Sequence, residues 1–149
     1  MQKRIVIGSD HIGYPLKEYL KTILKDMGWE VEDCGTHNRA RTDYPIYANK
    51  VAQKITSGEY EKGILICGSG VGMSITANKI HGIRAVVCSE PYSAVLSRKH
   101  NNSNILCMGS RVVGEELAEM IVREWLAAEY EGGRHQNRLD MINELEEKY

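Results

Sequence analysis

The sequence predicts an α/β protein, a three-layer α/β/α Rossmann-like domain with a five-stranded parallel sheet. Short β-rich runs alternate with helical patterns along the chain, which is typical of parallel strands covered by helices on both sides. One run, Gly63–Cys67, is apolar throughout, as expected of a strand buried on both faces. With 149 residues the chain has the length of one domain, so we expect a single domain over residues 1–149.

The five expected strands are short runs rich in β-branched and apolar residues. They cover Arg4–Gly8, Trp29–Asp33, Gly63–Cys67, Ile83–Cys88 and Asn104–Met108. Helices are expected where apolar residues recur at i, i+3, i+4 and i+7, over residues 16–27, 48–55, 71–79, 91–99 and 113–125. Right-handed crossovers place the carboxyl ends of all strands at one edge of the sheet, where ligands bind in such folds.

The C-terminal segment follows a break at Gly132-Gly133. Arg134–Lys148 is polar, with Leu139, Ile142 and Leu145 on one side of a predicted helix. A last helix that comes after the strand–helix alternation often packs on a neighbouring molecule. We therefore hypothesise that residues 134–149 form an arm that packs on the partner subunit of a homodimer.

Composition excludes several function classes. The net charge is −1, so there is no overall basic field to attract nucleic acid or an anionic membrane. No apolar run approaches the roughly 20 residues needed to span a bilayer, and the N-terminus has no signal-peptide pattern. The four cysteines form no CxxC pair, which favours reduced thiols. We expect a soluble, cytoplasmic protein.

A glycine-rich loop, Cys67–Ser74, links the buried third strand to a helix. Glycines let backbone N–H groups approach a ligand, and a helix N-terminus adds partial positive charge. The loop therefore suits a phosphate or a developing oxyanion. A glycine-rich turn that binds nothing is the alternative.

Three other loop chemistries fit this segment poorly. A P-loop needs a lysine that is absent, and a dinucleotide fingerprint needs GxGxxG after the first strand rather than GxGxG after the third. Glu90 does lie about 20 residues further on, as a ribose-binding acid would. A thiol phosphatase needs an arginine where Met73 stands.

Cys67 is the candidate for chemistry among the four cysteines, because it directly precedes the loop and a helix N-terminus favours the thiolate. Cys34, Cys88 and Cys107 are interpreted as inert, buried thiols. His100 and Asn101 precede the fifth strand, where they could move a proton and hold an enolate oxygen. A plain helix C-terminus is the alternative there.

Other polar groups also follow the strands or the glycine break. Asp10 and His11 follow the first strand, where they could take part in a site at this edge of the sheet. The alternative is that they cap the first helix. Arg111 follows the fifth strand, and Arg134 and Arg138 share a face of the last helix. Guanidinium groups bind phosphate well, although a solvated charged face is the simpler interpretation.

Eight strings of residues, taken together, resemble the type B ribose-5-phosphate isomerases. They run from the first strand to the last helix in a specific order, and related isomerases of allose 6-phosphate and galactose 6-phosphate share the scaffold. The strings are Gly8–His11, Asp43–Pro45, Ile66–Gly72, Ala77–Lys79, Gly82–Ala85, His100-Asn101, Gly109–Val113 and Gly132–His135.

The resemblance implies aldose–ketose isomerisation through a cis-enediolate, without metal or cofactor. His100, assisted by Asp10, would open the furanose ring, and Cys67 would move the proton between C2 and C1. One branch of the family uses a glutamate in the loop, but this chain has Met73 there and so resembles the cysteine branch. The residues implied to bind substrate are Ser69 with the amides of Gly68, Gly70, Val71 and Gly72, Asn101, the phosphate ligands His11, Arg111, Arg134 and Arg138, and the lining residues Tyr44 and His135.

The resemblance also implies a strand order of 2-1-3-5-4 and a homodimer with sites at the subunit boundary, possibly pairing into tetramers. Interconversion of D-ribose 5-phosphate and D-ribulose 5-phosphate is the expected activity. An isomerase of a six-carbon sugar phosphate and a non-catalytic sugar-phosphate binding module are the alternatives.

Overall fold

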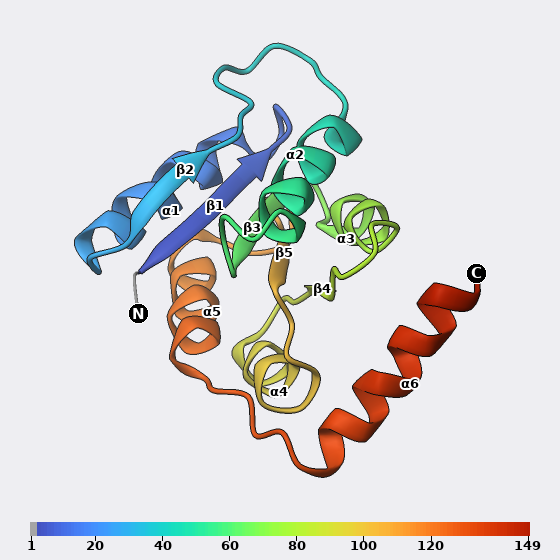
Figure 1. Ribbon diagram of the computed structural model, residues 1–149. Coiled ribbons are helices and arrows are strands. Elements are labelled where there is room, and N and C mark those ends of the chain that lie inside the picture. The colour runs from blue at the N-terminus through green and yellow to red at the C-terminus, as the bar shows by residue number, and fades with distance from the viewer. Residues whose placement is uncertain (1–2) are drawn as a thin grey trace.

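The computed structural model describes residues 3–149, in which five strands alternate with helices (Figure 1). The strands are β1 Arg4–Ser9, β2 Glu30–Asp33, β3 Gly63–Cys67, β4 Ala85–Val87 and β5 Ile105–Gly109. The helices are α1 Tyr14–Asp26, α2 Tyr44–Thr56, α3 Val71–Ala77, α4 Pro91–Asn101, α5 Glu115–Ala127 and α6 Arg134–Lys148.

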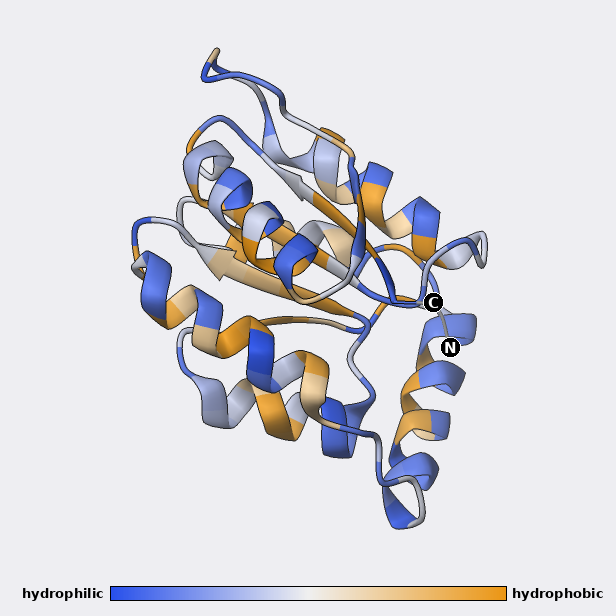
Figure 2. Ribbon diagram, turned by 90° about the vertical axis from the view of Figure 1, so that its left-hand side faces the viewer, coloured by the Kyte–Doolittle hydropathy of each residue, from blue (hydrophilic) through white to orange (hydrophobic). Residues whose placement is uncertain are grey.

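All strand pairs are parallel, and the sheet order is β2-β1-β3-β5-β4, which confirms the predicted fold class and the implied order. β3 lies at the centre, and all five of its residues are buried. Its side chains alternate between two cores. Ile64 and Ile66 pack with α1, α4 and α5 on one face, whereas Leu65 and Cys67 pack with α2 and α3 on the other. Figure 2 shows the apolar strands enclosed between helices whose outer faces are polar.

Most predicted bounds differ from the structure by one or two residues, and the start of the second helix and the fourth strand have a clear physical reason. The second helix begins at Tyr44 rather than residue 48, because Pro45 fits the first helical turn, where its missing N–H costs nothing. The fourth strand covers only Ala85–Val87, because Ile83 donates its N–H to Ile80 in a turn instead of to a neighbouring strand. No helix within residues 3–149 is long and apolar enough to cross a membrane.

The C-terminal helix α6 lies outside the three layers and runs along the exterior of the protein (Figure 1). Its buried residues are His135 and Leu139, and the Gly82 N–H donates to Glu146 Oε1 at 2.5 Å. Met141, Ile142 and Leu145 remain exposed. The helix forms over the predicted residues, while its packing on a partner subunit stays a prediction.

A buried lysine joins α1 to the edge strand β2. The Lys17 side chain is 0% exposed, and its Nζ lies 2.6 Å from Asp33 Oδ2. Lys21 contacts the same oxygen at 2.7 Å, and Glu18 pairs with both lysines. Burial alone would raise the pKa of the Asp33 carboxyl, but hydrogen bonds from Lys17, Lys21 and the Gly35 N–H lower it below its ordinary value.

Replacing Asp33 with asparagine should lower the free energy of unfolding by about 3 kcal/mol at pH 7, because Lys17 loses its main counter-charge in the interior. A lowered carboxyl pKa stabilises the fold above the unfolded-state value, near pH 4, and that contribution is lost as pH falls through the folded-state value. Urea unfolding at pH 7 and pH 3.5 measures both effects, and the variant should show the smaller pH dependence. Asp26→Asn, at the exposed end of α1, is the control, and equal stability of Asp33→Asn and wild type would contradict the assignment.

Candidate functional site

The carboxyl ends of β1, β3 and β5 are joined by hydrogen bonds between the segments that follow them. The Asp10 N–H donates to the Ile66 carbonyl at 3.3 Å. Ser110 and Arg111 donate to the carbonyls of Cys67 and Gly68 at 2.9 and 3.0 Å. The structure thereby brings Asp10, Cys67 and Arg111 to one edge of the sheet.

The glycine loop packs directly on the backbone of β5, and two positions there accept only glycine. Gly70 has φ +80°, and a Cβ at that position would lie 2.7 Å from the Met108 carbonyl carbon. A Cβ on Gly109 would lie 2.6 Å from the backbone of Ser69. Glycine is needed at both places because the two backbones approach more closely than a side chain allows.

Cys67 lies beneath this loop. Its side chain is packed in the core formed with α2 and α3 and is 4% exposed. The Gly70 N–H donates to Cys67 Sγ at 3.2 Å, so the sulfur faces the loop backbone. An N–H donor stabilises negative charge on sulfur. In a single chain the thiol is therefore at the expected edge, but it is buried rather than open to a cleft.

The loop offers further N–H donors. The Val71 N–H donates to Ser69 Oγ at 3.2 Å. The N–H groups of Gly68, Ser69 and Gly72 have no acceptor among residues 3–149. These unpaired donors at the start of α3 are groups that an anion or an enediolate oxygen could accept from.

The other three cysteines lack such a setting, in agreement with the interpretation from the sequence. The pKa of Cys88 is raised to about 11, mainly by burial and to a smaller extent by the negative charge of Glu90. Burial raises the pKa of Cys107 well above its ordinary value. Cys34 is half-buried rather than fully buried, and burial together with Glu32 raises its pKa. All three are protonated thiols at neutral pH.

Met73, the loop position at which the resemblance implies a glutamate in another branch, is fully buried in the same core as Cys67. That position therefore offers no acid or base to the loop.

Residues after β1 and at the start of α2 surround the loop. Asp10 Oδ1 accepts from the Gly13 N–H at 2.9 Å, so it orders the turn before α1 and does not cap the helix itself. His11 Nδ1 accepts from the Thr42 N–H at 3.2 Å, which places the proton of a neutral imidazole on Nε2.

Two exposed side chains lie over the glycine loop. A Cβ added to Gly72 would lie 2.5 Å from Tyr44 Cζ, so the Tyr44 ring rests on Gly72. A Cβ added to Gly68 would lie 3.6 Å from Arg111 Cδ, so the Arg111 stem covers Gly68. Tyr44 is 38% exposed, and Arg111 is also at the surface.

A second group of predicted residues lies around the end of α4 and the start of α6. The rings of His100 and His135 stack with centroids 4.3 Å apart. Glu131 Oε1 lies 3.8 Å from His100 Nε2 and 3.5 Å from His135 Nε2. Asn101, Arg134 and Arg138 are exposed, and within the described part of the chain neither arginine forms an ion pair.

The two groups lie at opposite edges of the sheet. α4 begins just after the carboxyl end of β4 and runs back toward the amino ends of the strands for 11 residues, about 16 Å. His100 therefore lies near the amino end of β5, whose first residue, Ile105, is in register with Gly63. Cys67 lies at the other end of β3, roughly 13–16 Å away along the strand. Within one chain the predicted catalytic residues Cys67 and His100 do not meet.

His100, Glu131 and His135 are also the group that could hold a metal ion, since their donor atoms lie within 4.8 Å of one another. The two imidazole planes differ by only 13°. Nearly parallel stacked rings direct their in-plane lone pairs side by side rather than at one point, so a shared ion would require His100 to turn. The arrangement as it stands suits a polar contact with Glu131 better than metal ligation.

Two contacts involve residues that were not anticipated. Glu131 precedes Gly132-Gly133, and its spacing of four from His135 was the available signal. Thr42 holds His11 through a backbone N–H, for which a sequence carries no signal because any residue except proline could supply it.

Sequence comparisons relate the chain to sugar-phosphate isomerases over nearly its whole length. The sequence profile described as Ribose/Galactose Isomerase matches residues 5–142. The chain is 58% identical over 146 residues to Ribose-5-phosphate isomerase B of Escherichia coli K12, covering 98% of each chain. It is 40% identical to a D-erythrulose-4-phosphate isomerase of Pectobacterium atrosepticum, covering 95% of this chain and 94% of that one.

Solved structures give the same result. Ribose-5-Phosphate Isomerase B of Clostridium thermocellum superposes with a TM-score of 0.97 at 53% identity, covering 98% of this chain and 99% of that chain. The type B ribose 5-phosphate isomerase of Trypanosoma brucei superposes with a TM-score of 0.92 at 42% identity, covering 97% and 99%. Because the profile and these relatives span nearly all of the sheet, the glycine loop and α6, the chain belongs to the Ribose/Galactose Isomerase family.

Proposed function

We propose that the protein is an aldose–ketose isomerase that interconverts D-ribose 5-phosphate and D-ribulose 5-phosphate. The observation that carries the proposal is a thiol at the end of β3 that accepts a hydrogen bond from the Gly70 N–H, beside a loop with further unpaired N–H donors. Relatives at 58% and 53% identity carry the name ribose-5-phosphate isomerase B, which supports the choice of a pentose phosphate. Four free thiols suit a reducing cytoplasm.

In the proposed reaction Cys67 acts as the base. Its thiolate takes the proton from C2 of the open-chain aldose, and the electron pair forms the C1–C2 double bond of a cis-enediolate. The thiol then returns the proton at C1 while the proton of the C2 hydroxyl passes to O1, which gives the ketose. Ser69, Asn101 and the N–H groups of Gly68–Gly72 would stabilise the enediolate oxygens, and preorganised donors of this kind contribute about 3 kcal/mol each in other enzymes.

His100 would open the furanose ring by moving a proton between the ring oxygen and the C1 hydroxyl, assisted by Asp10. Glu131 Oε1 lies 3.8 Å from His100 Nε2 and would orient the imidazole. No step calls for a metal or a cofactor, because the thiol and the imidazole perform both proton transfers.

A complete site then requires two copies of the chain. Cys67, Asp10, His11, Tyr44 and Arg111 would come from one protomer, and His100, Asn101, Arg134, His135 and Arg138 would come from its partner. Both halves occur in each chain, so a two-fold axis would form two equal sites. Around the Cys67 edge the exposed apolar side chains are numerous enough to form such an interface, namely Val71, Ile75, Val87, Tyr92 and Val112. Sedimentation of the purified protein distinguishes a dimer from a pair of dimers.

Other relatives are named for a different sugar phosphate, so the identity of the sugar is the point to test. The match to D-erythrulose-4-phosphate isomerases favours a four-carbon sugar phosphate as a second candidate, beside the six-carbon ones. Purified protein, with EDTA in the buffer, should be assayed with ribose 5-phosphate, allose 6-phosphate, galactose 6-phosphate and D-erythrulose 4-phosphate. The proposal expects the highest kcat/KM with ribose 5-phosphate. A higher value with another sugar, or inactivation by EDTA, would overturn the corresponding part of it.

Arg138→Met should raise KM for ribose 5-phosphate by about tenfold and change kcat little, because a charge-assisted bond to the phosphate is lost at a point remote from C1 and C2. Initial-rate kinetics separate the two constants. Arg123→Met, which removes an exposed arginine of α5, is the matched control. An unchanged KM in Arg138→Met would remove this residue from the phosphate site.

A further inference from the structure

A second cationic site lies at the edge of the sheet opposite the glycine loop. A cavity of about 530 Å³ opens there between the segment that precedes β3, the start of β4 and the end of α4. That volume lies within the roughly 300–1,000 Å³ typical of small-molecule sites. The cavity is lined by Ile55, Gly58, Tyr60, Glu61, Lys62, Arg84, Arg98, Asn102 and Asn104.

Three cations converge on this cavity without a carboxylate partner. Within residues 3–149, Lys62, Arg84 and Arg98 take part in no ion pair. Glu61 is the one acidic residue of the lining, and it is exposed to solvent, where its charge is screened. Positive charge in the cavity therefore exceeds negative charge.

The arginines are held in place by the turn that follows α4. Arg84 Nε donates to the Asn102 carbonyl at 2.8 Å. Arg98 Nη1 donates to Asn102 Oδ1 at 3.0 Å and to the Ser103 carbonyl. Arg98 is only 9% exposed, yet its buried Nε has no partner. A buried guanidinium that is incompletely bonded and uncompensated in charge is costly, and a bound anion would remove that cost.

The three groups also destabilise one another's charge. The pKa of Arg98 is lowered mainly by burial and to a smaller extent by repulsion from Arg84. The pKa of Lys62 is lowered mainly by burial and to a smaller extent by repulsion from Arg98. Burial also lowers the pKa of Arg84. Lys62 Nζ and the Nη atoms of Arg84 have no hydrogen-bond acceptor among residues 3–149, so they are available to a ligand.

We propose that Lys62, Arg84 and Arg98 form a second anion site, separate from the Cys67 loop, which binds phosphate groups of small molecules. Two forked guanidinium groups and one ammonium group match the oxygens of a phosphate or diphosphate. Asn102 and Asn104 add polar atoms to the wall. The volume accommodates a diphosphate more completely than a single phosphate ion.

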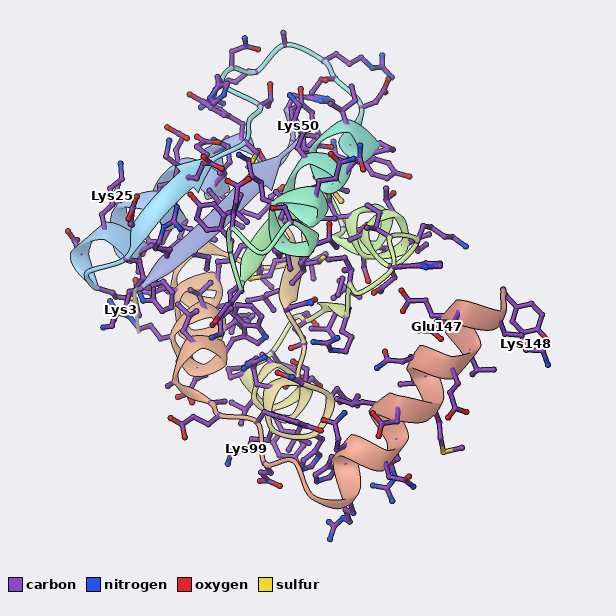
Figure 3. The ribbon with its side chains drawn as sticks, in the orientation of Figure 1. Lys3, Lys25, Lys50, Lys99, Glu147 and Lys148 are labelled. Carbon is purple, nitrogen blue, oxygen red and sulfur yellow. The ribbon has the colours of Figure 1, made fainter. Side chains whose placement is uncertain are left out.

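The test is calorimetric titration of the intact protein with pyrophosphate and, in parallel, with inorganic phosphate. Lys62→Met keeps the apolar stem and removes the charge, and Arg84→Gln removes a guanidinium. Arg111→Met alters the Cys67 edge instead. Lys25→Met removes an exposed lysine at the end of α1 (labelled in Figure 3), a helix that contributes no residue to the cavity, and is the matched charge control.

Pyrophosphate binding to the second site should weaken at least about tenfold in Lys62→Met and in Arg84→Gln, and it should persist in Arg111→Met and Lys25→Met. Tighter binding of pyrophosphate than of phosphate would identify a diphosphate as the better ligand, and the reverse a single phosphate group. Loss in Arg111→Met alone would assign the binding to the substrate site and overturn the proposal. Equal weakening in Lys25→Met would do the same, since it indicates attraction by net charge only.

Lys62 is partly exposed at the cavity and its Nζ donates no hydrogen bond within residues 3–149, so Lys62→Met is the variant whose folding is least at risk. Isomerase activity of Lys62→Met, Arg84→Gln and Lys25→Met shows that the fold and the substrate site are intact, and the circular dichroism spectrum shows whether Arg111→Met is folded. If Arg84→Gln fails to fold, Lys62→Met decides the matter alone, and wild-type affinity for pyrophosphate in that variant would refute the site.

Discussion

Replacing Cys67 with alanine should reduce kcat by about 10³-fold or more, while ribose 5-phosphate still binds. The variant removes the base but leaves the phosphate ligands and the N–H groups of the glycine loop in place. Calorimetric binding and initial-rate kinetics separate the two properties. Exchange of the C2 proton with deuterated solvent should also stop, because that exchange requires a base at C2.

Two further variants isolate the chemistry from packing. Cys67→Ser keeps an acceptor for the Gly70 N–H but replaces the thiol with a far weaker acid, so it should be nearly as inactive as Cys67→Ala. Cys34→Ala alters a half-buried thiol away from the loop and should retain wild-type kcat. Turnover of Cys67→Ala within tenfold of wild type would show that another group is the base.

Mixing two inactive variants should restore activity, and this is the second large effect that we expect. His100→Asn should lose turnover of ribose 5-phosphate because the furanose ring is no longer opened, while pre-opened substrate is spared. His100 and Cys67 lie at opposite edges of the sheet within one chain, so each would work with its counterpart on a partner.

The expected size of the recovery follows from symmetry. After denaturation and refolding together, Cys67→Ala and His100→Asn should form heterodimers in which one site carries both changes and the other carries neither. Random pairing makes half of the dimers heterodimers, so the mixture should recover about one quarter of the wild-type activity. Each variant refolded alone is the control. A mixture as inactive as its components would place His100 and Cys67 of the same chain in one site.

Local sequence signals were sufficient where burial or backbone geometry imposes one choice. The apolar run Gly63–Cys67 became a central strand with the predicted bounds, because it is buried on both faces. The glycine loop also lies as predicted, since Gly70 requires a left-handed backbone and Gly109 has no room for a side chain. The start of α2 and the ends of β4 were misplaced, because a proline in the first turn and a hydrogen-bonded turn leave no periodic pattern.

By itself the sequence determined the alternation of strands and helices, the central buried strand and the loop that offers N–H groups beside a thiol, since each depends on neighbouring residues. Tertiary structure alone decided that Cys67 is covered, that His100 stacks on His135 at the far edge, and that Lys62, Arg84 and Arg98 share a cavity. These arrangements join residues distant in the chain. The direction of α4 and the order of strands set them, and no local pattern of side chains encodes either.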